Sequence, residues 1–184
     1  MMTSLPTQEI DRETLVAELR QLGVTYLAPS DAVASTMLPS NDALLAAILD
    51  QSDFRLKLAL IPLLIRHPDW AQTVQSLVDR LDASLALELQ TLYTAAVYLQ
   101  RLWKTRLGFY LTQPTLLPDL YSQTLGLPSP NERFGKTGLY ELTDAWKSRS
   151  RYPFDRMASL STVMDLFFAQ LKLEYPLSPH ATAR

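Results

Sequence analysis

Residues 83–107 contain neither proline nor glycine, and their apolar side chains recur at alternating spacings of four and three residues. That spacing places them on one face of an α-helix. The predicted polar face carries Glu88, Thr91, Arg101 and Thr105. A helix of this length would cross a small domain. The pattern therefore predicts a central helix over 83–107, whose apolar stripe consists of Leu85, Leu89, Leu92, Ala96, Leu99 and Trp103.

Helical spacing dominates the rest of the chain, and no segment shows a convincing strand-like alternation of apolar and polar residues. Thr7, Asn41, Asp53 (or Ser52) and Asp155 are suitable caps for four of the helices. Pro62 should kink the helix that contains it, and Pro68 should end that helix at His67. Residues 24–27 could be extended and 31–37 a short helix. Further helices are predicted over residues 8–22, 42–50, 54–67, 70–81, 139–149 and 155–173.

The predicted organisation is one all-α domain over residues 1–184, a bundle of about six or seven helices. Residues 1–40 hold the first helix and a connection, and 41–111 hold the helical core. Residues 112–138 are rich in proline and glycine, which is typical of a surface loop, with one short helix expected over 119–125. Residues 139–173 hold the last helices, and 174–184 are expected to be a flexible tail.

Composition excludes several classes of protein. The chain has 47% hydrophobic and 20% charged residues, which is typical of a globular protein. It has no cysteine, so disulfides and thiolate metal sites are excluded. The N-terminus lacks the pattern of a secretory signal, and no uncharged apolar run is long enough to span a membrane. These features favour a cytoplasmic protein.

Gly135-Lys136-Thr137 matches the last three positions of a phosphate-binding loop. The first glycine of that motif is replaced by Pro130, which has no N–H to offer a phosphate. The residues before it do not form a β-branched apolar strand. The interpretation is a surface turn that leads into a helix, with no nucleotide and no other cofactor bound.

Few residues have the spacing that catalysis requires. His67 lies at a predicted helix end, where a capping role is expected, and His180 lies in the tail. No cluster has the spacing of metal ligands, and Asp79 and Asp82 are interpreted as a solvated pair. We therefore predict a non-enzymatic protein with no metal site.

Charge is divided unevenly along the chain. Residues 1–92 carry 6 Lys or Arg and 12 Asp or Glu, a net charge of −6, whereas residues 93–184 carry 11 and 7, a net charge of +4. This asymmetry favours an oriented partner or self-association of the chain.

Basic and aromatic residues gather in two segments of the positive half. Cations in such a setting bind acidic protein surfaces or phosphates. The overall pI near 5.7 favours the protein over nucleic acid. The candidate partner-binding residues are Arg101, Lys104 and Arg106 in the first segment, and Trp146, Lys147, Arg149, Arg151 and Tyr152 in the second.

Two stretches carry a resemblance to known proteins. The stretch SDFRLKLALIPLLIRHPDW, within residues 41–82, resembles a HEAT-like helical hairpin, although no second copy follows at a fixed period. The longer stretch LPSNDALLAAILDQSDFRLKLALIPLLIRHPDW, together with LYTAAVYLQRLWKTRLGFYL, resembles small all-helical bacterial and cyanobacterial proteins associated with nucleotidyltransferase-type toxin–antitoxin pairs. This second resemblance implies an antitoxin-like, non-catalytic adaptor or regulator of a separate enzyme. A nucleic-acid-associated protein is the alternative, and an enzyme with an unrecognised site is less favoured.

Overall fold

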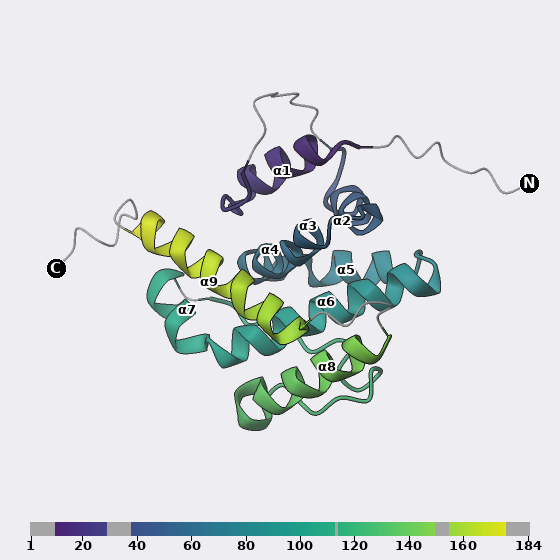
Figure 1. Ribbon diagram of the computed structural model, residues 1–184, viewed down its shortest axis with the longest axis vertical. Coiled ribbons are helices and arrows are strands. Elements are labelled where there is room, and N and C mark those ends of the chain that lie inside the picture. Colours follow the sequence, from purple (N-terminus) through teal and green to yellow (C-terminus); the bar gives the residue numbers. More distant parts are fainter. Residues whose placement is uncertain (1–9, 29–37, 113, 150–154, 176–184) are drawn as a thin grey trace, which may run out of the picture.

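Helix α6 (Ala83–Leu102) is the centre of an all-α helical bundle. The computed structural model describes residues 10–28, 38–112, 114–149 and 155–175. The side chains of α6 from Leu89 to Gln100 are all buried except that of Gln90. Helices α2, α4, α5 and α8 pack against it, and α9 crosses between α4 and α8 (Figure 1). The all-α class and the central position of this helix are therefore confirmed.

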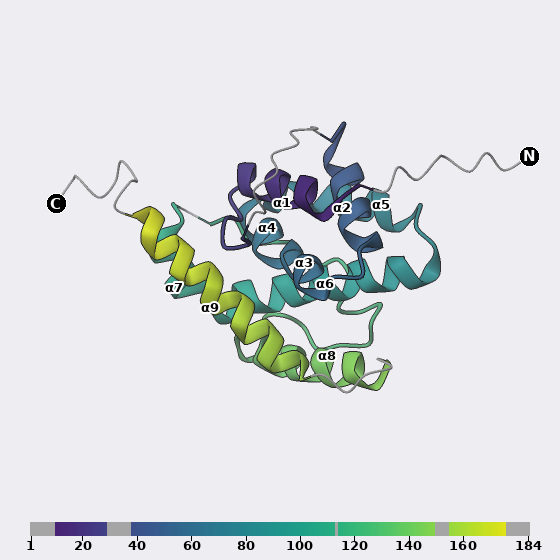
Figure 2. The same ribbon diagram turned by 45° about the horizontal axis from the view of Figure 1, so that its top comes forward.

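The described residues of the N-terminal half form five short α-helices. They are α1 (Arg12–Gln21), α2 (Asn41–Asp50), α3 (Phe54–Leu58), α4 (Leu60–Arg66) and α5 (Ala71–Val78), with a 3₁₀ turn, η1 (Pro68–Trp70), before α5. Figure 2 shows α1 and α2 lying over α3 and α4, on the side of the bundle away from α8. Helices α2 to α5 are formed by the segment whose sequence resembles a HEAT hairpin, and that resemblance stays a prediction.

Helix ends in this half follow local chemistry. Asp53 caps α3 by accepting the N–H of Arg55 at 2.9 Å, as predicted. The helix divides at Ala59 because Pro62 has no N–H to donate to the carbonyl of Leu58. His67 ends α4 before Pro68, also as predicted.

Other predicted boundaries were wrong. Helix α1 begins at Arg12, and its cap is Asp11, which accepts the N–H of Thr14 at 2.7 Å. Ser40 is the N-cap residue of α2, and Asn41 is its first helical residue. Thr7 and residues 31–37 lie outside the described residues.

The C-terminal half contains α7 (Lys104–Tyr110), a 3₁₀ turn η2 (Glu132–Gly135), α8 (Lys136–Arg149) and α9 (Arg156–Glu174). Asp155 caps α9 by accepting the N–H of Ala158, as predicted. The expected helix over 119–125 is absent from this part of the described chain, where residues 122–126 form turns. Helix α8 begins at Lys136, three residues earlier than predicted.

The predicted helix 83–107 is interrupted at Trp103, although this residue is neither glycine nor proline. The ring of Trp103 packs edge-on against the ring of Phe168 in α9, with 5.6 Å between the ring centres. The ring of Tyr110 also packs against Phe168, at 6.4 Å. Tertiary contacts with α9 therefore accompany the bend between α6 and α7.

Thr91, predicted to be exposed, is buried, and its hydroxyl donates to the Leu87 carbonyl at 2.7 Å.

Hydrogen bonds and an ion pair join α9 to the N-terminal half. Gln170 is buried, donates to the carbonyl of Gly23 at 2.6 Å and accepts the N–H of Thr25 at 2.9 Å. Arg66 at the end of α4 pairs with Glu174 near the end of α9. These bonds hold the chain after α1 against α9, although the two lie far apart in sequence.

Candidate protein-binding surface

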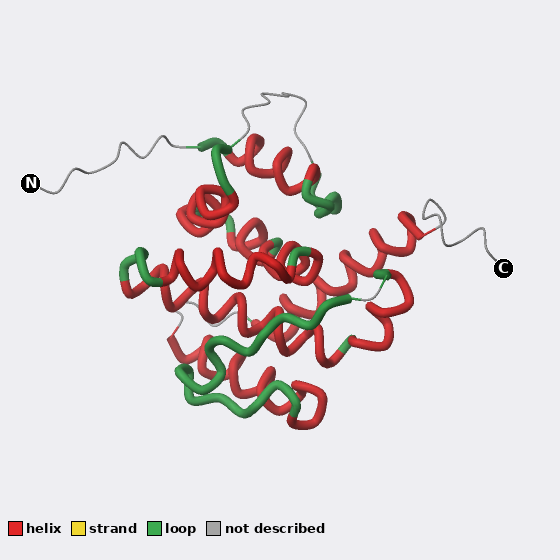
Figure 3. The backbone as a smooth tube through the Cα atoms, turned by 180° about the vertical axis from the view of Figure 1, so that it is seen from behind, coloured by secondary structure: helices red, strands yellow, loops and turns green. Residues whose placement is uncertain are grey.

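One face of α6 holds the irregular segment 114–128 in place through polar side chains. Gln100, which is fully buried, donates to the carbonyl of Thr115 at 2.8 Å and accepts the N–H of Leu117 at 2.7 Å. The hydroxyls of Tyr93 and Tyr98 donate to the carbonyls of Pro118 and Pro128 at 2.9 and 2.7 Å. Seen from behind in Figure 3, this segment runs across the outside of the helices.

Tyr98 also positions the start of α8. A Cβ atom at Gly138 would lie 2.3 Å from ring atom Cζ of Tyr98, and a Cβ atom at Gly135 would lie 2.8 Å from the Tyr98 carbonyl oxygen. Only glycine allows this close approach of α8 to α6. The two glycines around Lys136-Thr137 therefore serve packing, which is consistent with the interpretation of this stretch as a turn and not a phosphate loop.

The turn η2 has an unusual backbone. Arg133, Phe134 and Gly135 all have positive φ, at 45°, 58° and 81°. Glycine adopts this region readily, but an arginine and a phenylalanine rarely do. The conformation leaves the Phe134 side chain 77% exposed. Non-glycine residues held in such backbone conformations persist where the surrounding packing fixes them, and they concentrate at functional sites.

Phe134 has basic and aromatic neighbours. Arg133 and Lys136 are exposed on either side of it in sequence, and Tyr140, one helical turn after Lys136, is 56% exposed. We call Arg133, Phe134, Lys136 and Tyr140 the α8 entry surface. Its aromatic residues and Arg133 are of types that are enriched in protein interfaces, whereas lysine is depleted there and suits the rim.

The first predicted basic segment lies beside this surface, but its residues differ in role. A Cβ at Gly135 would be 3.4 Å from the Arg101 Cβ, so η2 packs on the end of α6. Arg101 is half-buried and donates to the Leu117 carbonyl at 2.8 Å, and burial lowers its pKa from the ordinary value. Arg106 stacks over the Phe168 ring at 3.9 Å. Lys104 is exposed and is the first residue of α7.

The second predicted segment lies at the other end of α8. The Trp146 ring packs edge-on against Phe54 of α3 at 5.7 Å, and the Arg156 guanidinium lies 4.1 Å from the Phe54 ring and 5.2 Å from the Trp146 ring. Trp146 therefore joins α8 to α3 and α9. Lys147 and Arg149 are exposed, whereas Arg151 and Tyr152 lie outside the described residues. The two predicted segments are thus separated by the length of α8.

Sequence reasoning missed Arg133, Phe134 and Tyr140. Tyr140 stands four residues after Lys136, and this spacing could have indicated a shared face. Phe134 is exposed on a backbone with positive φ, and no local pattern in the sequence predicts that conformation.

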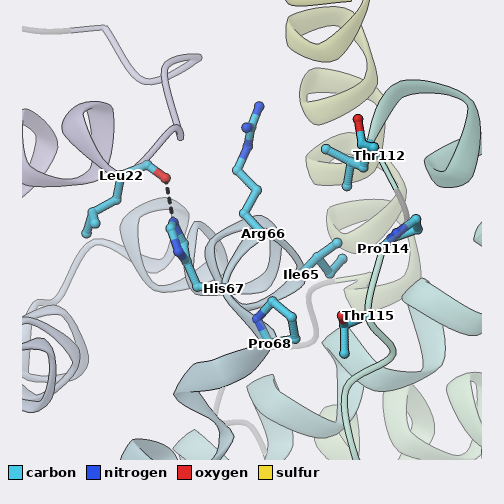
Figure 4. A pocket seen from close by; sticks show the side chains of 9 residues that line it. Leu22, Ile65, Arg66, His67, Pro68, Thr112, Pro114 and Thr115 are labelled. Carbon is cyan, nitrogen blue, oxygen red and sulfur yellow. Dashed lines mark hydrogen bonds between the residues drawn. The ribbon is translucent and has the colours of Figure 1, made fainter. Parts of the chain in front are cut away.

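A polar cavity of about 290 Å³ lies between the end of α4 and the chain after α7 (Figure 4). His67 points toward the carbonyl of Leu22 and donates to it from Nε2 at 2.9 Å. Its ring stacks on Trp70 at 5.2 Å. Arg66, on the same rim, points toward the space between α1 and α9, where it pairs with Glu174. Both side chains hold helices together, in keeping with the capping role expected for His67.

The chain matches no protein-family model, no curated protein and no solved structure. Among the described residues, no three His, Cys, Asp or Glu side chains are grouped so that they could hold a metal ion. No helix within the described ranges is both long and apolar enough to cross a bilayer.

We expect isothermal titration calorimetry to detect no saturable binding of ATP or GTP to the chain, and Lys136→Ala to change nothing in that titration. Gly135 and Gly138 face Tyr98, and no strand precedes the turn among the described residues. Saturable binding that disappears in Lys136→Ala would contradict this interpretation.

Proposed function

We propose that the chain is a non-catalytic protein-binding module, which acts in the cytoplasm as an adaptor or regulator of a separate enzyme. The observation that carries the proposal is Phe134, which is 77% exposed on a backbone with positive φ. Exposing a phenylalanine to water is unfavourable, and a partner that buries it gains the free energy of removing the ring from water. The resemblance to antitoxin-associated helical proteins favours the same role.

The packing behind Phe134 also supports this function. Tyr98 is fully buried, and its backbone and ring touch the positions of Gly135 and Gly138. The hydroxyl of Tyr98 is in turn bonded to Pro128. A side chain presented from a fixed backbone loses less conformational freedom on binding than one on a mobile loop. Phe134 is therefore suited to act as an anchor residue.

The proposal is tested by capture of proteins from a lysate of the native host, with the immobilised chain as bait and mass spectrometry as the readout. Phe134→Ala is expected to lower the amount of the specifically captured protein at least about tenfold, because interface anchors contribute 1.4 kcal/mol or more. Leu173→Ala is the matched control, because Leu173 is also 77% exposed but lies near the C-terminal end of α9. Equal capture by the two variants and the wild type would refute the role of Phe134.

A further inference from the structure

We infer that the partner of the α8 entry surface is a protein with an apolar pocket for the Phe134 ring and carboxylates placed opposite Arg133 and Lys136. This inference rests on the proposed function and adds the chemistry of the partner. Arg133 and Lys136 are exposed and flank Phe134 in sequence. Lys104, the first residue of α7, is exposed just beyond the end of α6, and η2 packs against α6. A complementary surface therefore needs negative charge beside an apolar centre.

Acidic side chains on the same turn and helix separate a protein partner from a nucleic acid. Glu132 precedes Arg133, and Glu141 and Asp144 are exposed on α8 beyond Tyr140. A nucleic-acid backbone carries phosphates at regular short intervals, and these carboxylates would repel it. On a protein surface, carboxylates can lie opposite Arg133 and Lys136 without lying opposite the acidic side chains of this chain. The alternation of charge around Phe134 therefore favours a patterned protein surface over a uniform polyanion.

The test is charge reversal of the two cations, Arg133→Glu with Lys136→Glu, and the readout is the same capture experiment. The lysate is treated with nuclease, and capture is measured at 50 mM and 500 mM NaCl. The control is Arg55→Glu with Lys172→Glu, which makes the same change of net charge at exposed positions on α3 and α9. Circular dichroism melting of each variant verifies that the fold survives.

We expect the reversed variant to lose at least tenfold in capture at 50 mM NaCl, with a smaller deficit at 500 mM because salt screens the charges. The control variant should capture as the wild type does. Undiminished capture by the reversed variant, while Phe134→Ala still loses capture, would overturn the inference and leave the proposed function standing. Failure of the wild type to capture any protein above the bare matrix would overturn both.

Two further outcomes identify other occupants, and each overturns the inference. Fluorescence anisotropy with a labelled (dT)20 oligonucleotide would reveal a nucleic-acid occupant by tight binding that falls steeply with salt and is lost in the reversed variant. Sedimentation velocity of the purified chain would reveal a second copy as the occupant, if oligomers form and disappear in Phe134→Ala. We expect nuclease treatment to leave the amount of protein captured by the wild type unchanged. We also expect the purified wild type and Phe134→Ala to have the same sedimentation coefficient.

Discussion

Substitution of Gly138 by alanine is expected to destabilise the protein by at least about 2 kcal/mol, although alanine is the better helix former by about 1 kcal/mol. The new Cβ would lie 2.3, 2.4 and 2.6 Å from three atoms of the Tyr98 side chain. Tyr98 is 0% exposed and its hydroxyl donates to the Pro128 carbonyl, so moving the ring away would disturb the core and break that hydrogen bond. A loss of this size lowers the melting temperature by roughly 4–8 °C in a chain of this length.

Gly108→Ala is the matched control for this prediction. Gly108 lies in α7, and a Cβ at this position would meet no atom within 4 Å. The same substitution should therefore leave the melting temperature unchanged or raise it slightly through helix propensity. Thermal melts followed by circular dichroism measure both variants. If Gly138→Ala melted at or above the temperature of Gly108→Ala, the close packing of α8 on Tyr98 would be wrong.

Gln100→Ala is expected to cost about 3 kcal/mol of stability. The substitution leaves the carbonyl of Thr115 and the N–H of Leu117 without the side chain that bonds both, and a buried polar group left without a partner costs about 1–3 kcal/mol. It also removes a 3.3 Å contact that Arg101 makes with the Gln100 amide oxygen. Urea denaturation measures the change in the free energy of unfolding.

The site of proteolytic cleavage in Gln100→Ala distinguishes a local loss of the Gln100 hydrogen bonds from a general weakening of the core. Limited proteolysis of Gln100→Ala should cleave the segment around Thr115–Leu117 earlier than in the wild type, because that segment is held by α6 side chains. Gln72→Ala, at an exposed position on α5, should alter neither stability nor cleavage measurably. Wild-type stability and an unchanged cleavage pattern in Gln100→Ala would contradict the anchoring role.

Helices with apolar periodicity and a capping side chain could be predicted from sequence. Asp53 and Asp155 cap α3 and α9 as expected, because capping depends on residues within one turn. Pro62 and Pro68 act on the backbone locally, so the division of α3 from α4 and the end of α4 also follow from the sequence. The all-α class emerges from the sum of these local preferences.

The features that the sequence did not predict depend on distant contacts. Helix α8 begins at Lys136 although glycine at 138 weakens a helix, because the close approach to Tyr98 compensates. Trp146, a candidate partner-binding residue, packs on Phe54, which lies about ninety positions away in sequence. Phe134 is exposed on a left-handed backbone. The candidate surface could therefore be found only once α6 and α8 were placed together.

The most direct test of a protein-binding role is the dissociation constant of the captured protein, measured by biolayer interferometry against immobilised wild type, Phe134→Ala and Leu173→Ala. Our account predicts that Phe134→Ala raises the dissociation constant at least about tenfold and that Leu173→Ala leaves it unchanged within about twofold. A dissociation constant that is equal for wild type and Phe134→Ala, in a variant that melts normally, would contradict it.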